Sequence, residues 1–565
     1  MAAAYQFTLV VVLLSFLSTT LSLRDNDPKT VYVILDDATQ TFKFSENVEN
    51  KYVVSANYVD SMNATGWSFL DIAASSDVAY NDSVRAYAAG LAESYLTRES
   101  INLQWQNTIA GYCEKPYSDY CQRLQGFLNA NLLWVKEQIR QNRNNPYWHH
   151  VALFYEQLAG LQDGYSKSVR QVNMDIELFG LYAFQYSGDL EDLEEVLHKP
   201  VPRRILGSGS CSALVKVLPG NEEIYVAQDT WTSFQNMLRI LKRYKLGFTA
   251  SGHQDVLAPG DTMTFSSYPG SIMSGDDYYH LSSDMVSMET TIGNSNNDLW
   301  KYVTPQSVLE GVRSLVANRL ATSGVEWAYY FSQENSGTYN NMWMIVDMKR
   351  FSPKSQSLNS GLLTVLEQIP NMIKYADLTS LLEKKGYFAS YNVAYFPEIF
   401  NASGGPENVK KYGDWFSYDH TARANIFRRD HSKVKDIDSM MKLMRYNDFT
   451  HDPLSRCNCT PPYSGENAIS ARSDLNPKNG KYPFSSLGHR SHGGIDAKIT
   501  SYSNFMQLEK TFIAVAGPTY DQLPPFQWSK ADFASECPHY GHPDLFRFTP
   551  MMYNGTIPDL KWTAP

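Results

Sequence analysis

Cys211 follows four small residues and opens a stretch rich in β-branched and apolar residues, in "GSGSCSALVKVL" (207–218). A thiol attacks a carbonyl carbon well only as the thiolate, so a nearby amine or imidazole must take its proton. Cutting the Ser210–Cys211 peptide bond would give Cys211 an α-amine, whose pKa is about 8 in model peptides. One residue would then hold nucleophile and base. The small residues before it would let the thiol attack the preceding carbonyl in an N-to-S acyl shift. A buried structural thiol, or a disulfide with Cys537, is the alternative.

The other four cysteines form two local pairs. Cys113 and Cys121 flank "EKPYSDY", whose Pro, Ser and Asp suit a turn, so we expect a disulfide in an oxidising compartment. Cys457 and Cys459 lie in the loop "RCNCTPPYSG", where a bond would close a very small ring. Pairing is still favoured over metal binding, because no nearby Cys-x-x-C or spaced histidine pair completes a zinc site.

Two further polar groups could resemble catalytic or metal sites. His489 and His492 in "GHRSHGG" lack carboxylates at ligand spacing, so we expect loop polar groups and predict no metal. Asp276 and Asp277 in "SGDDYY" could resemble a catalytic dyad. Adjacent strand residues point to opposite faces, which favours a structural role for at least one of them.

The N-terminus indicates export. Residues 7–17, "FTLVVVLLSFL", form an apolar run that is too short to span a bilayer and is followed by the small polar "STTLS". We expect a signal peptide over 1–23, with an uncleaved anchor as the alternative because the first basic residue is Arg24. No later run reaches the length of a membrane helix, so no transmembrane segment is expected in the mature chain.

Five sequons accompany this N-terminus and predict N-glycosylation. Together with it they place the protein in the secretory pathway, either in the lysosome lumen or outside the cell. The asparagines are Asn63, Asn81, Asn401, Asn458 and Asn554.

Composition limits the range of partners. The chain of 565 residues carries 49 basic and 59 acidic residues, a formal net charge of −10, and has no basic run. A nucleic-acid partner is therefore not expected. No sequence motif indicates a cofactor, and we predict none.

A coarse reading of the chain alternates strand and helix signals. Strands are predicted within 31–59, at 212–218 and at 223–230, and helices at 83–105, 123–141 and 151–169. Residues 188–204, acidic and then basic, are interpreted as a solvated surface segment or linker, and 234–246 as an amphipathic helix. Long antiparallel strands with helices outside fit this pattern better than regular β-α alternation.

Several long motifs resemble one family, the phospholipase B-like proteins. They run in order over nearly the whole mature chain and include "GSCSALVKVLPG", "DTWTSFQNMLRILKRYK", "FSSYPGSIMSGDDYY", "METTIGNSNNDLW", "GYFASYNVAYFPEIFNASGG", "ARANIFRRD" and "HRSHGGIDAKITS". Members are lumenal glycoproteins with an N-terminal-nucleophile hydrolase fold. The resemblance implies an α+β, four-layer αββα sandwich, with two mainly antiparallel sheets between helical layers.

The resemblance also implies self-cleavage between Ser210 and Cys211. An N-terminal fragment, 24–210, would stay associated with a C-terminal fragment, 211–565, that begins with the nucleophile. Both would belong to one structural unit.

Site residues carry over one by one. In "GYFASYNVAYF", Asn392 matches the asparagine expected to donate to the oxyanion. In "TARANIFRRD", Arg423 is the arginine expected near that site. Thr291 and Trp231 are expected to shape the pocket. Gln228 in "VAQDTW" stands where the family pattern often has a histidine, so that position here offers hydrogen bonding and no proton transfer. Without the resemblance, Asn392 could cap a turn and Arg423 could pair with a nearby acid.

The predicted function is acyl hydrolysis in an acidic lumen through an S-acyl intermediate. The family name implies deacylation of phospholipids, and an amidase acting on N-acyl lipids or peptide-like amides is the alternative. An alternative of another class is a lumenal lipid-binding protein that cuts itself but turns over little, since turnover also needs an open pocket.

Overall fold

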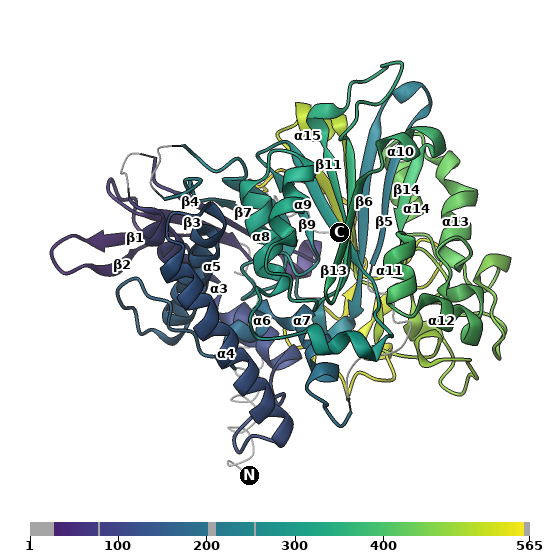
Figure 1. Ribbon diagram of the computed structural model, residues 1–565, viewed down its shortest axis with the longest axis horizontal. Coiled ribbons are helices and arrows are strands. Elements are labelled where there is room, and N and C mark those ends of the chain that lie inside the picture. Colours follow the sequence, from purple (N-terminus) through teal and green to yellow (C-terminus); the bar gives the residue numbers. More distant parts are fainter. Residues whose placement is uncertain (1–26, 77–79, 202–210, 253–255, 559–565) are drawn as a thin grey trace, which may run out of the picture.

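The computed structural model describes residues 27–76, 80–201, 211–252 and 256–558. The predicted signal peptide over 1–23 and Ser210 lie outside these residues. The protein is a mixed α+β structure with two large sheets (Figure 1).

In the described chain, the larger sheet has eleven strands and is antiparallel except where β4 runs parallel to β7. Strands β1 to β4 precede residue 211 and the others follow it, so both sides of the predicted cleavage point build one sheet. In order across the sheet, the strands are β13 (Met372–Asp377), β12 (Leu363–Ile369), β11 (Asn341–Asp347), β10 (Met285–Thr291), β9 (Tyr278–Leu281), β8 (Thr262–Ser267), β7 (Ile240–Lys245), β4 (Ser68–Ala74), β3 (Val54–Val59), β1 (Lys29–Asp36) and β2 (Thr41–Ser45).

The smaller sheet is antiparallel and contains the predicted nucleophile. Strands β5 and β6 form a hairpin around "PGN", where Gly220 and Asn221 have positive φ values of 71° and 53°. In order across the sheet, the strands are β14 (Tyr387–Ser390), β5 (Cys211–Val217), β6 (Ile224–Ser233), β16 (Asp496–Ser501), β17 (Phe512–Ala516) and β20 (Met551–Tyr553), with β15 (His492–Gly494) paired to β6. The short β18 (Phe526–Gln527) and β19 (Leu545–Phe546) pair with each other.

Helices cover the outer faces of both sheets (Figure 1). On the larger sheet these are α3 (Asp82–Thr108), α5 (Pro146–Ser166), α8 (Glu310–Leu320) and α9 (Gly324–Ser332), and on the smaller sheet α13 (Ala422–Asp430) and α14 (Ile437–Met444). The remaining helices are α2 (Met62–Thr65), α4 (Asp119–Gln141), α6 (Tyr182–Gln185), α7 (Ser187–Val196), α10 (Thr379–Lys385), α11 (Pro397–Ala402), α12 (Gly405–Tyr412) and α15 (Tyr502–Gln507).

Three hydrophobic cores join these layers. Ile72 and Tyr279 of the larger sheet pack with the helices on its outer face. Val226 of β6 and Met288 of β10 belong to the core between the sheets. Leu214 of β5 packs on the far side, under α13 and α14. Alternate residues of β5 therefore face different cores, as the twofold period of a strand requires.

Helices α3 and α5 cross closely because both carry a glycine at the crossing. A Cβ atom on Gly90 would clash with the main-chain oxygen of Gln157, and one on Gly160 with that of Tyr87. Each helix begins at an asparagine cap, Asn81 and Asn145, whose side chain accepts a main-chain N–H of the first turn.

Most predicted elements are confirmed, and two are wrong. The predicted helix over 234–246 is mainly strand β7. The two faces of β7 lie in different cores, so apolar residues occur on both faces and do not alternate with polar ones. The resulting pattern resembles the period of a helix. The predicted solvated segment over 188–204 includes helix α7, whose Asp189 and Asp192 are buried. Residues 202–204 of that segment lie outside the described chain.

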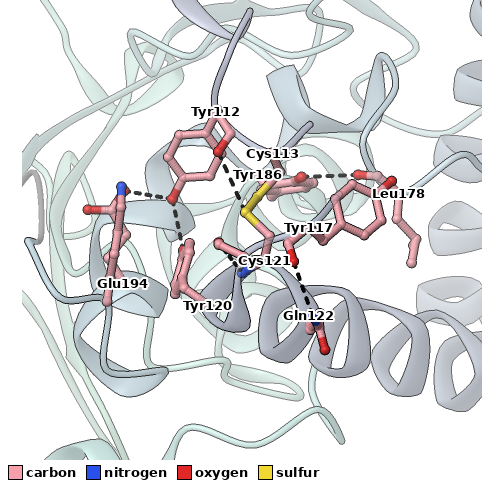
Figure 2. Close-up of a disulfide and its surroundings, with 11 residues drawn as sticks. Tyr112, Cys113, Tyr117, Tyr120, Cys121, Gln122, Leu178, Tyr186 and Glu194 are labelled. Atoms are coloured by element: carbon pink, nitrogen blue, oxygen red, sulfur yellow. Dashed lines mark hydrogen bonds and ion pairs between the residues drawn. A yellow bond between two sulfur atoms is a disulfide. The ribbon is translucent and has the colours of Figure 1, made fainter. Parts of the chain in front are cut away.

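The disulfide between Cys113 and Cys121 joins the end of α3 to the start of α4. Figure 2 shows it beside Tyr112, which donates a 2.6 Å hydrogen bond to buried Glu194 of α7. Cys457 also pairs with Cys459. Each bond lies on one side of residue 211, so neither links the two predicted fragments.

Among the helices of the described chain, none combines the length and apolar character needed to cross a bilayer.

Candidate active site at the start of strand β5

A cavity of about 760 Å³ opens at the start of β5 and receives residues from both sheets and from α3 and α7. Cys211, Thr230, Trp231, Thr291, Asn392 and Arg423 all line it. The structure thus brings together five residues selected from the sequence and adds Thr230. Gln228, the sixth selected residue, is fully buried behind the cavity.

Cys211 is the first residue of β5, and only 3% of it is exposed. Neither Cys211 nor Cys537 forms a disulfide, so the alternative pairing between them is wrong. Burial raises the pKa of the Cys211 thiol well above its ordinary value, and the Glu289 carboxyl adds to this increase. The Trp231 main-chain N–H and the Lys498 ammonium group lower the same pKa. In the uncut chain, burial therefore favours the unreactive thiol.

Arg423 holds the start of strand β5 in place. Its Nη1 donates to the Cys211 main-chain oxygen over 2.7 Å and to Ser212 Oγ over 3.2 Å. Its Nη2 donates to the Tyr391 oxygen over 2.9 Å and to Asn392 Oδ1 over 2.6 Å. Burial lowers the Arg423 pKa to about 10, so the guanidinium remains charged in an acidic compartment.

The position of Arg423 follows from its helix. Thr421 caps α13 by accepting the N–H of Ala424, and Arg423 lies in the first turn, directly beside the cavity. The guanidinium carbon lies 4.2 Å from the centre of the Trp231 ring, within the range of a cation–π interaction. Trp231 is held from its other side by a 3.2 Å hydrogen bond from Nε1 to the Ile469 oxygen.

Asn392 has a left-handed main chain, with φ of 68°, just after β14. Its Nδ2 donates to the main-chain oxygen of Thr291 over 2.6 Å, while its Oδ1 accepts from Arg423. Asparagine tolerates this conformation better than most residues. The turn therefore fixes a neutral amide between the ends of β10 and β14, next to Cys211.

Gln228 connects the two sheets. Its Nε2 donates to the main-chain oxygens of Asp276 over 2.7 Å and Glu289 over 2.8 Å. A hydrogen-bonding position without proton transfer was expected, but the side chain lies outside the cavity wall.

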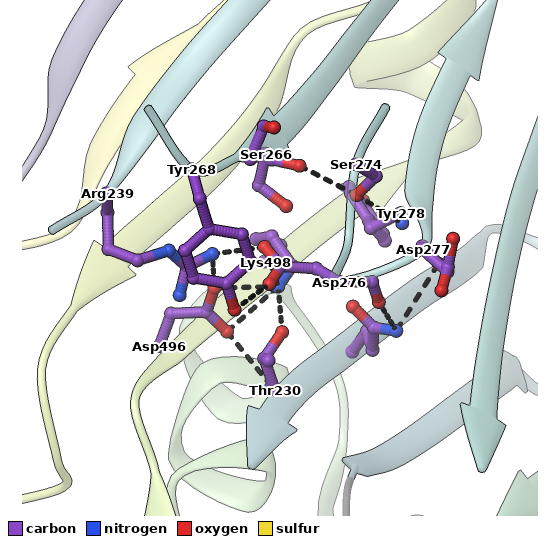
Figure 3. Close-up of polar contacts among 12 residues, drawn as sticks. Thr230, Arg239, Ser266, Tyr268, Ser274, Asp276, Asp277, Tyr278, Asp496 and Lys498 are labelled. Atoms are coloured by element: carbon purple, nitrogen blue, oxygen red, sulfur yellow. Dashed lines mark hydrogen bonds and ion pairs between the residues drawn. The ribbon is translucent and has the colours of Figure 1, made fainter. Parts of the chain in front are cut away.

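Thr230 was missed by sequence reasoning. It lies opposite Cys211 in the β5–β6 hairpin, so the two side chains share the face toward the larger sheet. Lys498 donates to Thr230 Oγ1 over 2.6 Å (Figure 3). The signal was the hairpin itself, because pairing the two predicted strands around "PGN" places 211 opposite 230.

A network of buried ion pairs lies beside Thr230 (Figure 3). Lys498 pairs with Asp496 over 2.7 Å and lies 3.8 Å from Asp276. Arg239 contacts both aspartates, over 2.9 Å to Asp496. We call Arg239, Asp276, Asp496 and Lys498 the ion network, in which two buried cations face two buried carboxylates.

Asp277 belongs to a different cluster. Asp277 immediately precedes β9 and has a φ of 56°. The expectation that Asp276 and Asp277 are successive strand residues is therefore wrong. The two side chains nevertheless lie in separate environments. Burial raises the Asp277 pKa to about 7, and Asp276 and Asp189 contribute. Burial also raises the pKa of Glu289 and Glu310 well above the ordinary value. We call Asp189, Asp277, Glu289 and Glu310 the acid cluster.

The two histidines singled out from the sequence have protein partners. His489 lies between the Asn476 oxygen and Asp532 Oδ1, at 2.6 and 3.0 Å. His492 Nδ1 lies 3.9 Å from Glu466 Oε2. Across the described ranges, no group of three or more histidine, cysteine, aspartate or glutamate side chains is placed to hold a metal ion.

Comparison with known proteins identifies one family over most of the chain. The sequence model of the family described as Phospholipase B matches residues 54–553. "Putative phospholipase B-like 2" of Mus musculus is 50% identical over 531 residues, which cover 93% of this chain and 88% of that protein. The Homo sapiens protein of the same name is 52% identical over 507 residues, covering 88% and 85%. "Phospholipase B-like protein B" of Dictyostelium discoideum is 36% identical over 540 residues, covering 93% and 90%.

Proposed function

The chain belongs to the phospholipase B family, and we propose that it is a self-processing acyl hydrolase whose nucleophile is the thiol of Cys211. The observation that carries this proposal is the position of Cys211. It is a free cysteine at the first residue of a strand, it lines the cavity of about 760 Å³, and Arg423 binds its main-chain oxygen.

Self-processing begins with attack of Cys211 Sγ on the carbonyl carbon of Ser210. The C–N bond then breaks, the proton lost by the thiol goes to the new α-amine, and a thioester links the fragments. Water hydrolyses that thioester, leaving a carboxylate on Ser210 and a free amine and thiol on Cys211.

In the mature protein, the α-amine of Cys211 acts as the general base, because position 228 holds glutamine instead of the histidine often found there in the family. A model-peptide amine has a pKa of about 8, so it can accept the thiol proton during attack and return it to the leaving alcohol or amine. Sγ bonds to the acyl carbon, the leaving group departs, and water then attacks the S-acyl carbon with the same amine as base. Gln228 does not titrate and takes no part in these proton transfers.

Asn392 and Arg423 are assigned to the tetrahedral oxyanion. Asn392 Nδ2 donates to the Thr291 oxygen at the cavity, and we assign this neutral amide to the oxyanion. Arg423 orients Asn392 through Oδ1 and places a fixed positive charge beside the same position. Thr291 and Trp231 form the walls.

The fragments 24–210 and 211–565 would remain together after cleavage. Strand β4 pairs with β7 along six residues, from Ser68 opposite Ile240 to Ala73 opposite Lys245. Separating the fragments would expose these strand edges and the α3 side of the core, at a large cost in apolar burial. The arrangement of two sheets between helical layers supports an N-terminal-nucleophile hydrolase fold.

The proposed location is the lysosome lumen or the extracellular space, after removal of the signal peptide over 1–23. Surface accessibility supports the glycosylation prediction, because a glycan acceptor must reach solvent. Asn63, Asn81, Asn401 and Asn458 are exposed, and Asn554 is partly exposed.

The substrate proposed first is a phospholipid ester, by analogy with the names of the relatives. A direct test compares an acyl ester, lysophosphatidylcholine, with an N-acylethanolamine of the same chain length, using protein incubated at about pH 5. Cys537→Ala is the matched control for Cys211→Ala, because Cys537 is the other free cysteine. Ester hydrolysis that requires Cys211 alone is expected.

Other results would redirect the proposal. Hydrolysis of the amide alone would identify an amidase. Lipid binding without turnover, together with a Cys211 thiol that iodoacetamide does not label after incubation, would identify a lipid-binding protein.

A further inference from the structure

We propose that Phe400, Trp415 and Phe416 form the binding site for the hydrocarbon chain of the acyl group that Cys211 attacks. The proposal rests on the proposed acyl hydrolase function and adds the direction in which the substrate lies. All three aromatic side chains line the same cavity as Cys211.

The aromatic wall is continuous with the oxyanion residues. Val393 and Ala394 follow Asn392 directly and line the cavity, and Phe400 comes soon after them on α11. On the other side, Trp415 and Phe416 precede Thr421, the cap that places Arg423. An acyl chain attached to a carbonyl at Asn392 and Arg423 therefore reaches the aromatic wall without leaving the cavity.

Contacts to neighbouring side chains hold the wall in a fixed shape. Trp415 Nε1 donates to Asn467 Oδ1 over 2.7 Å. The ring of buried Phe484 lies 4.9 Å from that of Trp415 and 5.3 Å from that of Phe416. Aromatic side chains that are anchored in this way lose little conformational freedom when a ligand binds.

The segment that carries Phe400 is also fixed. Ser295 N donates to the Ser403 oxygen over 2.8 Å, and Asn408 Nδ2 donates to Ser295 Oγ over 2.9 Å. A Cβ atom on Gly405 would clash with the Phe400 ring, so glycine there lets the ring lie against the start of α12. Contacts from the loop after β10 therefore position this part of the wall.

The opposite side of the cavity has a different surface. On that side Phe184, Leu190 and Met273 are buried, Ile109 is partly exposed, and Ala110, Gln106 and Glu191 are exposed. In contrast, Phe400, Trp415 and Phe416 are partly exposed toward the cavity. Three partly exposed aromatic rings thus face the cavity from the α11–α12 side, whereas the α3 and α7 side offers the smaller apolar surface of Ile109 and Ala110 beside polar groups. This difference directs the hydrocarbon chain to the aromatic wall and the polar leaving group toward α3 and α7.

The test is the dependence of hydrolysis on chain length, with p-nitrophenyl acetate and p-nitrophenyl laurate as the probes. Each buried methylene strengthens binding severalfold, so Trp415→Ala and Phe416→Ala should each raise the laurate KM by about tenfold. Both should leave the acetate KM unchanged. Tyr329→Ala, at an exposed aromatic residue of α9 outside the cavity lining, is the matched control and should change neither KM.

Equal changes for both esters, or no change for laurate, would overturn the proposal. Trp415→Phe, which keeps an aromatic ring, is the control for misfolding of Trp415→Ala. It should retain most of the preference for p-nitrophenyl laurate over p-nitrophenyl acetate. If the wild type hydrolyses neither ester, the proposed function fails, and a titration that measures binding of free laurate tests the binding site separately. Loss of laurate binding in Trp415→Ala would support the proposed binding site, and unchanged binding would contradict it.

Discussion

The ion network and the acid cluster lie side by side near Cys211 and differ in what surrounds their buried carboxyl groups. In the ion network, Lys498 and Arg239 face Asp276 and Asp496. In the acid cluster, burial is the largest cause of the raised pKa of all four carboxyl groups, and neighbouring carboxyl groups add to the increase for Asp277, Glu289 and Glu310. The ion network pairs each buried carboxylate with a cation, whereas burial keeps the carboxyl groups of the acid cluster neutral when the pH is low.

The boundary between these two groups passes between two consecutive residues. Asp276 accepts from Tyr268 over 2.5 Å and from Arg239, while Asp277 turns away toward Glu289. The acid cluster is therefore neutral at low pH and gains negative charge as the pH rises.

The largest effect is expected when the ion network is broken. Lys498→Met removes a buried cation from Asp496 and the donor to Thr230, which should lower the free energy of unfolding by about 3–5 kcal/mol. Urea denaturation measures this change. Lys510→Met, which removes a partly exposed pair with Asp284, should cost about 1 kcal/mol or less. Similar losses for both variants would show that the network is not a special support.

The acid cluster should make the protein more stable in acid. Burial raises the Asp277 pKa from 3.8 to about 7, so the native state binds more protons than the unfolded state between these values. Stability is therefore highest at low pH and falls as the pH rises through this window, by up to about 1.4 kcal/mol per pH unit for each such group. Asp277→Asn should flatten the dependence of Tm on pH between 4 and 7, measured by calorimetry.

Glu222→Gln, at an exposed position, is the control for that experiment and should leave the slope unchanged. A wild-type Tm that rises from pH 5 to pH 7 would contradict the assignment of the acid cluster.

Glu289 should also control the reactivity of the thiol. Burial is the largest cause of the raised Cys211 pKa, and the Glu289 carboxyl is the next. Glu289→Gln removes the negative charge that forms at higher pH, so alkylation of Cys211 by iodoacetamide should accelerate by up to about tenfold, the effect of one pKa unit. Mass spectrometry of the labelled peptide gives the rate. Equal alkylation rates for wild type and Glu289→Gln at pH 8 would contradict an effect of the Glu289 carboxyl on the Cys211 thiol.

The smallest effect is expected at Thr230, which lies opposite Cys211 and accepts a hydrogen bond from Lys498 of the ion network. Thr230→Val keeps the shape but removes the acceptor for Lys498, which should cost about 1 kcal/mol of stability. Thr230→Ser keeps the hydroxyl and should lose less, as measured by urea denaturation. A serine variant that is as unstable as the valine variant would mean that the methyl contact, rather than the hydrogen bond, supports β6.

The sequence predicted most of the residues that line the cavity with Cys211. The small residues before Cys211 and the strand after it made Cys211 a candidate nucleophile, and both features depend only on local sequence. Asn392 and Arg423 came from the family motifs, and their mutual hydrogen bond agrees with a shared role.

Features that depend on register or on tertiary burial were not predicted. Thr230 faces Cys211 only once the hairpin register is known, and Lys498 reaches Thr230 from a strand far along the chain. The separation of Asp276 from Asp277 depends on a left-handed residue that the letters "DD" do not reveal. Strand β7 was mistaken for a helix because it is apolar on both faces.

Whether Cys211 becomes an N-terminal nucleophile is tested by intact mass and N-terminal sequencing of the protein before and after incubation at about pH 5. Wild type, Cys211→Ser and Cys211→Ala are compared. We expect a new N-terminus at Cys211 in the wild type, slower cleavage in the serine variant and none in the alanine variant. A wild-type chain that stays uncut, or a cut before residue 211 that persists in Cys211→Ala, would contradict it.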